Sequence, residues 1–534
     1  MTDASGPGAT AVPTQQTRIS PAWIAAYAAA VAVFALCLFA GLDAHLLWGD
    51  EAETAVKASN VLRFGVPRVD DGSNSILVNS SDANAQRVWT WSPWLQEYVC
   101  AGSLALFGRT TTAARLPFAL ATFLAGLLLA RFMFVEYGQH AVALLSLVLF
   151  TTSVPVLLHG RQSRYYALLM LSGVGLLAGY RRLLDGRWGS GAFLLGTMLA
   201  VQAYCNYLTV VVNSAALLGA GLFAALRFPK VTRTVAVAGT VAFVLVLPWL
   251  IYARPWTEQA GILSLQLWRP NFPDATKMLN EYLIPLPALA AGLLGLVLKP
   301  TTAARRDSAE DSSKEWHLRL FMVLALSTWW VVLPLSKFVY LRYASSAFPI
   351  AAAFSALTLV SVTRSTMLRI VLAAVLSLTN VIPFVGLEWM VSYPLRHLEW
   401  TFPSFARGFL SPYDERARHV VDFLAAHAEP GDIVAVPDPE FPLIFYNRNI
   451  RIFDTRLRDP SLIEGPPRWA LPASATGVEP RAFVVPPACR DRYEVIALDV
   501  PDTPRLHALP DPDRHQYATA VAREQFVILR RKEP

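Results

Sequence analysis

The chain has 534 residues, of which 54% are hydrophobic and 16% charged, with a mean hydropathy of +0.39 and a formal net charge of +7. An ordinary soluble protein carries about a quarter charged residues, so this composition excludes a soluble globular enzyme and indicates a polytopic membrane protein. The basic residues are scattered between apolar runs, which suits membrane topology and predicts no nucleic-acid partner.

The first segment, residues 1–20, is rich in Thr, Gln and Pro, and we expect it to be a disordered cytoplasmic tail. Arg18 precedes an apolar stretch over residues 22–42, which is longer than a signal-peptide core and lacks a convincing cleavage site. This stretch is predicted to be an uncleaved signal anchor and the first membrane span.

Ten further apolar runs are long enough to cross a membrane. They cover residues 112–134, 140–158, 165–184, 190–204, 208–226, 235–252, 278–298, 318–335, 343–362 and 370–387. The sequence therefore predicts an α-helical bundle of about 11 transmembrane helices within a domain spanning residues 21–388.

Lys and Arg gather in alternate gaps between these runs, at residues 181–187, 227–233, 299–319 and 364–369. By the positive-inside rule these gaps are cytoplasmic, as is the amino terminus. An odd number of spans then places everything after residue 387 outside. We expect a multi-pass protein of the plasma (inner) membrane with a long first external loop, residues 43–111.

That loop contains a second, shorter apolar stretch at residues 92–108, with Gln96 and Glu97 inside it. It is predicted to be an amphipathic helix lying in the membrane interface rather than a span. The aromatic residues Trp89, Trp91 and Trp94 are expected at headgroup level, as candidate acceptor contacts.

Residues 389–534 have a different composition, with proline, charge and short strand-like runs. Residues 415–453 predict a helix, a turn, a strand, a helix and a strand, and further strands are expected at 482–485, 493–500 and 526–530. The region is predicted to be an extracytoplasmic α/β domain large enough for its own core.

Two carboxylates, Asp50 and Glu51, follow the first span immediately. In a structural interpretation, Asp50 is a helix N-cap and Glu53 completes a capping box. In a functional interpretation, both carboxylates are catalytic. The two are compatible, since a cap would fix the direction of the carboxylate.

A second candidate is "HGRQSRYYAL", residues 159–168, at the outer end of a span. Arg161 and Arg164, with Tyr165 and Tyr166, suit a phosphate that carries a ring, because Arg binds phosphate bidentately and Tyr stacks and donates. The alternative is that the arginines extend to lipid headgroups.

Further cations lie at outer boundaries, against the topological bias. Lys337 and Arg342 fall in "SKFVYLRYASSAFP", and Arg254 and Arg269 fall in the loop 253–277. They are candidate donor-phosphate contacts. For Lys337 and Arg342 the alternative is attraction to anionic headgroups. The loop 253–277 is compatible with an ordered lid, an interfacial helix or a plain aromatic anchor.

Three segments, taken together and in order, have the pattern of a known family. They are "WGDEAETAVKASNVLRFGVPRVDDG", "WSPWLQEYVCAGSLALFGRTTTAARLPFAL" and "GRQSRYYALLMLSGVGLL", with "YLRYASSAFPIAAAF" as a weaker match. Here the sequence resembles the GT-C superfamily of polyprenyl-phosphate-dependent glycosyltransferases, in the family 39-like group of protein O-mannosyltransferases and lipid A aminoarabinose transferases.

The resemblance implies transfer of a sugar from an isoprenoid monophosphate to an extracytoplasmic lipid, glycan or protein, with inversion. It implies that Asp50 is the base, Glu51 its companion, and Arg161, Arg164, Tyr165 and Arg342 donor contacts. Some relatives hold a metal through an Asp in the loop where this chain has "RQSRYY". The missing acid disfavours a divalent metal, and no cofactor is certain.

Two other functions stay open from the sequence: a lipid or polysaccharide transporter (flippase), and a membrane scaffold whose external domain binds. A transporter is disfavoured because proton-coupled carriers place ionisable groups at mid-membrane. Few of the predicted spans carry such a group at their centre.

Overall fold

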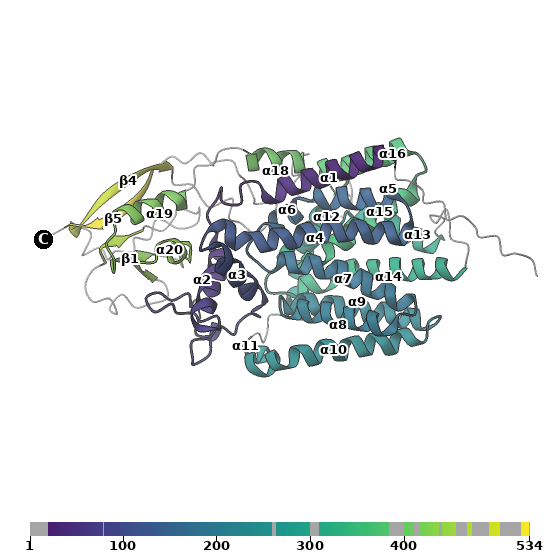
Figure 1. The fold of residues 1–534 in the computed structure, drawn as a ribbon, viewed down its shortest axis with the longest axis horizontal. Coiled ribbons are helices and arrows are strands. Elements are labelled where there is room, and N and C mark those ends of the chain that lie inside the picture. The colour runs from purple at the N-terminus through teal and green to yellow at the C-terminus, as the bar shows by residue number, and fades with distance from the viewer. Residues whose placement is uncertain are drawn as a thin grey trace, which may run out of the picture.

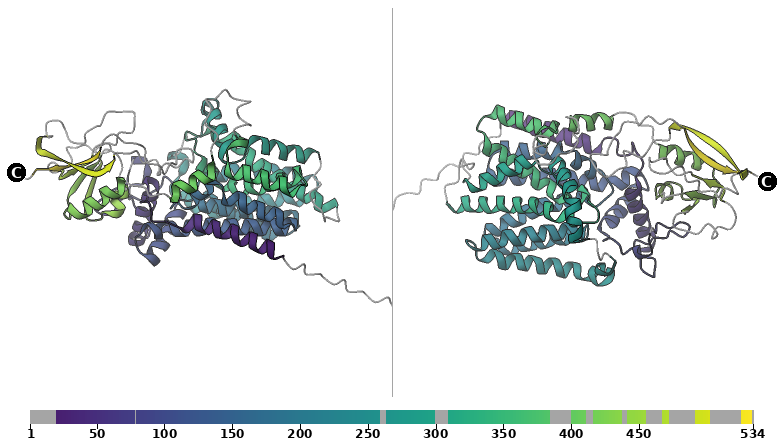
Figure 2. Two further views of the ribbon diagram at one scale, coloured as in Figure 1. Left: turned by 90° about the horizontal axis from the view of Figure 1, so that it is seen from above. Right: turned by 180° about the vertical axis from the view of Figure 1, so that it is seen from behind.

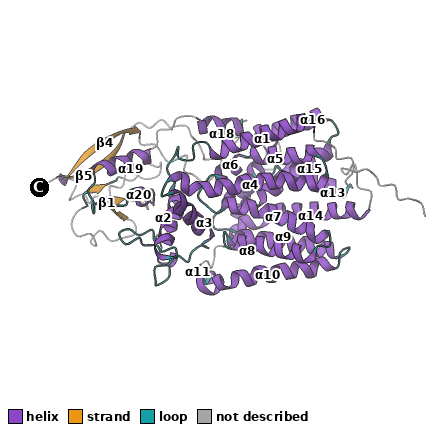
Figure 3. Cartoon of the chain, in the orientation of Figure 1, coloured by secondary structure: helices purple, strands orange, loops and turns teal. Residues whose placement is uncertain are grey.

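Helices form most of the molecule, and its strands lie together at one end, as Figure 3 shows. The computed structural model describes residues 20–77, 79–258, 263–298, 309–383, 400–410, 416–436, 441–454, 467–471, 491–501 and 525–532. The predicted disorder before residue 20 and the predicted strand at 482–485 lie outside these residues.

The helical part is an elongated bundle whose long helices run side by side (Figure 1, Figure 2). Its helices are α1 (Pro21–Phe39), α4 (Thr111–Tyr137), α5 (His140–Thr151), α6 (Val154–Gly160), α7 (Tyr166–Leu184), α8 (Trp188–Ala203), α9 (Tyr207–Ala225), α10 (Lys230–Ala253), α12 (Leu265–Tyr282), α13 (Leu286–Val297), α14 (Ala309–Val332), α15 (Phe348–Val362) and α16 (Thr366–Leu378). The shorter segments are α11 (Pro255–Glu258), η2 (Leu333–Leu335), η3 (Leu341–Ala347) and α18 (Thr401–Leu410).

The described residues contain seven helices long and apolar enough to cross a membrane, or nine if each of two bent pairs is one span. The chain is therefore a multi-pass membrane protein, but the predicted count of 11 is not confirmed. Two of the predicted spans correspond to helices that are shorter than the about 20 residues a span needs: α8 has 16 residues and α16 has 13.

Proline breaks two of the predicted spans. α5 and α6 meet at 63°, where Pro155 lacks the N–H that would continue the helix. α12 and α13 meet at 79°, with Pro285 at the break. α12 begins at Leu265, so most of the described part of the segment 253–277 is helical, and a helix was one of the alternatives that the sequence left open for it. A hydropathy window misses α12 because its apolar residues lie on one face only.

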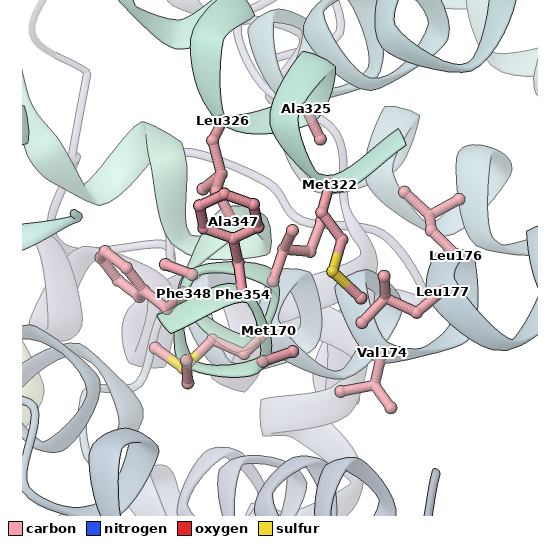
Figure 4. Packing of buried hydrophobic residues seen from close by; sticks show 14 of the residues in the cluster. Met170, Val174, Leu176, Leu177, Met322, Ala325, Leu326, Ala347, Phe348 and Phe354 are labelled. Atoms are coloured by element: carbon pink, nitrogen blue, oxygen red, sulfur yellow. The ribbon is translucent and has the colours of Figure 1, made fainter. Parts of the chain in front are cut away.

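The bundle core lies where α7, α14 and α15 meet (Figure 4). Large buried side chains from the three helices interdigitate there, among them Met170, Leu177, Met322, Leu326 and Phe354. Small residues let the backbones approach, which is the usual basis of helix association in membranes.

Gly173 marks the closest such approach above this core. A Cβ at this position would collide with the backbone carbonyl oxygen of Ser346 in η3. We expect Gly173→Ala to lower the free energy of unfolding by about 1–3 kcal/mol through overpacking. Unfolding in SDS, followed by tryptophan fluorescence, measures this. Gly239→Ala is the matched control, because nothing lies within 4 Å of its Cβ position; an equal loss in both variants would contradict the packing argument.

Two further helices lie between the bundle and the sheet, α2 (Gly49–Phe64) and α3 (Leu95–Phe107), with the short η1 (Ser80–Asp82) in the connection (Figure 1). α2 and α3 pack against each other. α3 has 13 residues and is not among the candidate spans, in agreement with the interpretation of residues 92–108 as a helix that does not cross the membrane.

The sheet has the strand order β2-β1-β3-β5-β4. Its strands are β1 (Ile433–Val436), β2 (Arg451–Asp454), β3 (Trp469–Ala470), β4 (Tyr493–Pro501) and β5 (Gln525–Arg531). β1 is parallel to β2 and β3, whereas β5 is antiparallel to β3 and β4. With α19 (Arg416–His427) and α20 (Phe441–Tyr446), this confirms the predicted helix–strand–helix–strand order of residues 415–453.

Most of the described buried apolar residues of the sheet region form one cluster with those of α2 and α3, and a smaller cluster of Ala435, Ala470, Tyr493 and Leu529 lies within the sheet itself. Polar contacts reinforce the joint. The Tyr446 hydroxyl accepts from Leu47 N (3.0 Å), Arg109 donates to the carbonyls of Ile444 and Phe445 (3.1 and 3.0 Å), and the Asn74 amide bonds the backbone beside β2. The C-terminal region therefore holds α2, and with it the carboxylates that α2 carries.

Candidate active site

Asp50 lies in the first turn of α2 but does not cap it. Trp48 is the N-cap, and its N–H donates to Glu51 Oε2 (3.4 Å). The predicted cap by Asp50 with Glu53 is therefore wrong, because the helix begins at Gly49 and Glu51 does the capping. The partial positive charge of the helix N-terminus favours a carboxylate at Asp50, and the described helix backbone does not use that carboxylate as a cap.

The Asp50 carboxylate faces two guanidiniums. Its Oδ2 lies 3.6 Å from Arg342 Nη1 and 3.8 Å from Arg164 Nη2, and its side chain is 31% exposed. Both distances exceed a hydrogen bond, so the three groups attract one another without being locked together. The structure thus brings together Asp50, Arg164 and Arg342, three residues that the sequence singled out from positions far apart in the chain.

Arg164 is held in place by hydrogen bonds to α2. Its Nη1 donates to the Asp50 carbonyl oxygen (3.2 Å) and to Thr54 Oγ1 (3.1 Å), and Glu53 Oε2 lies 3.8 Å away. Burial opposes the charged form, but Asp50 and Glu53 outweigh it and raise the pKa of Arg164 further above its ordinary value. Arg164 therefore stays cationic at any physiological pH.

Arg342 enters from η3 on the other side. Its guanidinium lies over the Tyr340 ring at 4.1 Å and over the Trp48 ring at 5.9 Å, two cation–π contacts that hold it in place. Its Nη1 is buried without a hydrogen-bond partner among the described residues. This donor therefore faces the Asp50 carboxylate at 3.6 Å without a hydrogen bond.

Glu51, predicted as a second catalytic residue, is fully buried and structurally engaged. Arg115 donates to both of its oxygens (2.9 and 2.6 Å), and the Ser163 N–H donates to Oε1 (2.8 Å). Arg115 also bonds the carbonyls of Leu42, His45 and Leu46. Arg115 was not among the predicted site residues, although the "AARLPF" stretch that contains it is part of the family resemblance.

A buried charge network supports α2 from the side of α3. Lys57 is fully buried and lies 2.8 Å from both Glu53 Oε1 and Glu97 Oε1. The Gln96 amide donates to Glu97 and accepts from the Tyr165 N–H (both 3.0 Å). The sequence signal was present, since Gln96 and Glu97 interrupt an apolar stretch, but their partner Lys57 was not predicted.

Arg161 and Tyr165 are bonded to other parts of the bundle, although the Tyr165 ring also lies 5.6 Å from the Arg164 guanidinium. Arg161 donates to the carbonyls of Cys37, Ala40 and Gly41, where α1 ends, at 2.7–2.9 Å. The Tyr165 hydroxyl accepts from Asn206 Nδ2 (3.1 Å). Burial raises the pKa of Tyr165, so its phenol stays protonated. These contacts assign both residues to holding the loop in shape.

The predicted aromatic cluster is divided. Trp89 is buried with its ring 3.9 Å from Lys57 Nζ, so its predicted place at headgroup level is wrong. The Lys57 charge attracts the ring face there. Trp94 packs edge-on against Trp249 and Tyr252 at the end of α10, and Trp91 is half-buried beside the α2–α3 core.

Three predicted cations lie on the surface. Lys337, Arg254 and Arg269 are all exposed, and the structure describes no contact between them and the Asp50 carboxylate. Arg254 ends α10 in the left-handed region, at φ 46°, a conformation that a non-glycine residue seldom adopts. Their predicted role in donor binding stays a prediction.

A resident metal does not fit this site. Within the described residues there is no group of three or more His, Cys, Asp and Glu side chains that could hold one. Asp50 is already flanked by two cations, which would repel a third.

No protein-family profile matches the chain, and no curated protein matches it. Among solved structures, ArnT from Cupriavidus metallidurans bound to undecaprenyl phosphate has a TM-score of 0.52 and 14% identity, covering 81% of this chain and 86% of that chain. This chain shares the fold of that structure. The predicted helical membrane bundle with a small C-terminal α/β region is thereby confirmed.

Two other solved structures match more loosely. The oligosaccharyltransferase AglB from Archaeoglobus fulgidus, in complex with an inhibitory peptide and a dolichol-phosphate, has a TM-score of 0.48 and 11% identity, covering 82% of this chain and 65% of that chain. The arabinosyltransferase EmbB from Mycobacterium smegmatis has a TM-score of 0.40 and 14% identity, covering 67% of this chain and 32% of that chain.

Proposed function

We propose that this GT-C protein is an inverting glycosyltransferase that moves a hexosyl or pentosyl group from a polyprenyl-phosphate donor to a hydroxyl of an extracytoplasmic lipid, glycan or protein. The observation that carries the proposal is the Asp50 carboxylate between Arg164 and Arg342, at the end of the bundle next to the sheet. The ArnT structure with the same fold holds undecaprenyl phosphate, which agrees with the proposed donor class.

The chemistry follows from the charges. Asp50 accepts the proton of the acceptor hydroxyl, whose oxygen attacks the anomeric carbon from the face opposite the phosphate. The bond from that carbon to the phosphate oxygen breaks, and the leaving polyprenyl phosphate keeps the electron pair. Arg164 and Arg342 stabilise the negative charge that develops on it, a contribution available only because both cations are already in place.

In this proposal Glu51 and Lys57 are positioning residues. Glu51 fixes the start of α2 to Arg115, and Lys57 fixes Glu53, which faces Arg164. Arg161 holds the loop that carries Arg164. None of the three needs to touch the substrate.

Two rival functions receive less support. A proton-coupled transporter would use ionisable groups at mid-membrane, whereas the charge network described above is built around α2 and α3, outside the long bundle helices (Figure 1). A scaffold with an external binding domain would not need a partly exposed carboxylate between two half-buried cations.

Reconstitution tests the proposed activity. The purified protein in nanodiscs, given radiolabelled polyprenyl-phosphate sugars and an envelope extract, should transfer label to an acceptor and release polyprenyl phosphate. Analysis of lipids and glycans from a deletion strain should show an accumulated donor and a missing sugar. Translocation of the lipid without transfer would support the flippase instead.

The proposed orientation places the Asp50 end outside and the opposite end in the cytoplasm. Asp185 lies 3.9 Å from Lys314, so two of the Arg-rich gaps meet at one end of the bundle. We expect Arg187→Cys to be labelled by a membrane-impermeant maleimide only after lysis, and Gln86→Cys to be labelled in intact cells. Both residues are exposed. With the four native cysteines replaced, labelling of position 187 in intact cells would reverse the topology.

A further inference from the structure

A group of polar atoms beside Asp50 is buried without hydrogen-bond partners. Hydrogen bonds of normal geometry to described residues are missing at His159 Nδ1 and Nε2, Gln162 Oε1, Arg164 Nε, Tyr166 Oη and Arg342 Nη1. His159 lies beside Gln162, and Tyr166 lies beside Arg164. His159 and Tyr166 are fully buried, and Gln162 is 6% exposed. Each unpaired buried polar group destabilises a protein, so several in one place indicate that a bound molecule completes them.

These atoms form one cluster. The His159 and Tyr166 rings meet edge to face, with centroids 5.1 Å apart, and the His159 ring lies parallel to Phe348 at 6.4 Å. The loop between His159 and Tyr166 carries Arg164, and Phe348 directly follows η3, which carries Arg342; both arginines face Asp50. The cluster is therefore continuous with the Asp50 site.

The cluster contains both hydrogen-bond donors and hydrogen-bond acceptors, and this combination indicates which class of ligand it would bind. Phosphate oxygens accept hydrogen bonds only, and the guanidiniums of Arg164 and Arg342 suit them. The Gln162 oxygen is an acceptor, a neutral imidazole offers one donor and one acceptor, and the Tyr166 hydroxyl does both. Such a set matches the hydroxyl groups of a sugar, which also donate and accept.

We propose that His159, Gln162 and Tyr166 form a subsite for the sugar of the lipid-linked donor, next to the phosphate at Arg164 and Arg342. This inference rests on the proposed function and goes beyond it, since it assigns sugar recognition to residues on α6, on the loop after it and at the start of α7. The His159 ring is parallel to Phe348, with centroids 6.4 Å apart, and edge to face with Tyr166, so its neighbours limit how far the imidazole can tilt.

The test measures binding of undecaprenyl phosphate, with and without an attached sugar, to the full chain in nanodiscs. The sugar-bearing probes are its mannosyl, glucosyl and arabinosyl esters. The wild-type protein should bind at least one of them more tightly than it binds undecaprenyl phosphate. His159→Ala and Tyr166→Phe should each remove about tenfold of that preference, the value of a lost hydrogen bond, and change binding of the sugar-free lipid less than twofold.

Tyr180→Phe is the matched control. Tyr180 is fully buried in the same helix, and its hydroxyl donates to the Ala220 carbonyl (3.2 Å). Its loss should leave the preference intact. Tyr166→Phe preserves the ring and the packing, so it keeps the test valid if His159→Ala fails to fold.

The outcomes separate the two proposals. If the wild-type protein binds no undecaprenyl lipid, the proposed function fails and the subsite with it. If it binds the lipids but prefers none with a sugar, or if the variants weaken sugar-free and sugar-bearing lipids equally, the subsite alone is overturned. Unchanged binding in both variants would mean that buried water satisfies the cluster, and would also overturn it.

Discussion

Replacement of Asp50 by Asn should reduce the turnover of sugar transfer by about 10²–10⁴-fold, the contribution typical of a general base. The amide keeps the size and shape of the carboxylate but cannot accept the proton of the acceptor hydroxyl. Binding of undecaprenyl phosphate should be retained or become tighter, because Arg164 and Arg342 would no longer share their charge with a carboxylate. The measurements are turnover with saturating labelled donor, and lipid binding in the same nanodiscs.

Asp43→Asn is the matched control, since Asp43 is an exposed acid just beyond α1 and the structure describes no ion pair at its side chain. It should transfer sugar at the wild-type rate. If Asp50→Asn kept more than about a tenth of the wild-type turnover, Asp50 would not be the base. If it lost lipid binding as well as turnover, the carboxylate would be organising the two arginines rather than accepting a proton.

The sequence was informative where a residue type violated its surroundings. Asp50 directly after a span, Arg164 at a helix boundary and Arg342 against the charge bias were each anomalous, and the structure brings all three together. The length of the apolar runs predicted the bundle for a different reason: a helix must have about 20 apolar residues to cross the membrane.

The sequence did not predict which side chains interact or where the predicted spans bend. Arg161 and Arg164 look alike in "GRQSRYY", yet one bonds the end of α1 and the other faces Asp50, because the loop turns between them. Lys57 gave no signal, since a lysine in a polar helix is ordinary until Glu97 from α3 is packed against it. The bends at Pro155 and Pro285 could be suspected from proline, but the angles depend on neighbouring helices.

The cluster around His159 shows a different limit. A histidine inside an apolar stretch can be a packed core residue or a ligand-binding residue, and the sequence alone does not distinguish these two roles. Only the three-dimensional arrangement shows that both ring nitrogens lack partners and that Tyr166 and Gln162 share this state. Unpaired polar atoms are a property of packing, so no pattern along the chain reports them.

Lys57→Met should cause the largest loss of stability, about 3–5 kcal/mol in the free energy of unfolding. The methionine fills the space of the lysine, but Glu97, fully buried at 2.8 Å from Lys57 Nζ, then keeps a charge without its cation. The Trp89 ring also loses its cation contact at 3.9 Å. Unfolding in SDS, followed by tryptophan fluorescence, gives the value.

The double variant Lys57→Met, Glu97→Gln should recover much of this loss, because it removes the unpaired charge while keeping the shape of the side chain. Lys314→Met is the matched control. Lys314 pairs with Glu310 at 2.8 Å and four residues apart, as Lys57 pairs with Glu53, but Glu310 is 65% exposed. Replacement of Lys314 should lower the free energy of unfolding by at most about 1 kcal/mol, since water replaces the partner of an exposed carboxylate.

Equal losses of stability at positions 57 and 314 would mean that burial of Glu97 carries no penalty. A double variant as unstable as Lys57→Met would mean that the lysine stabilises α2 by packing and not by charge. In either case the network would not be the support that holds Glu53, and through it Arg164, in place beside Asp50.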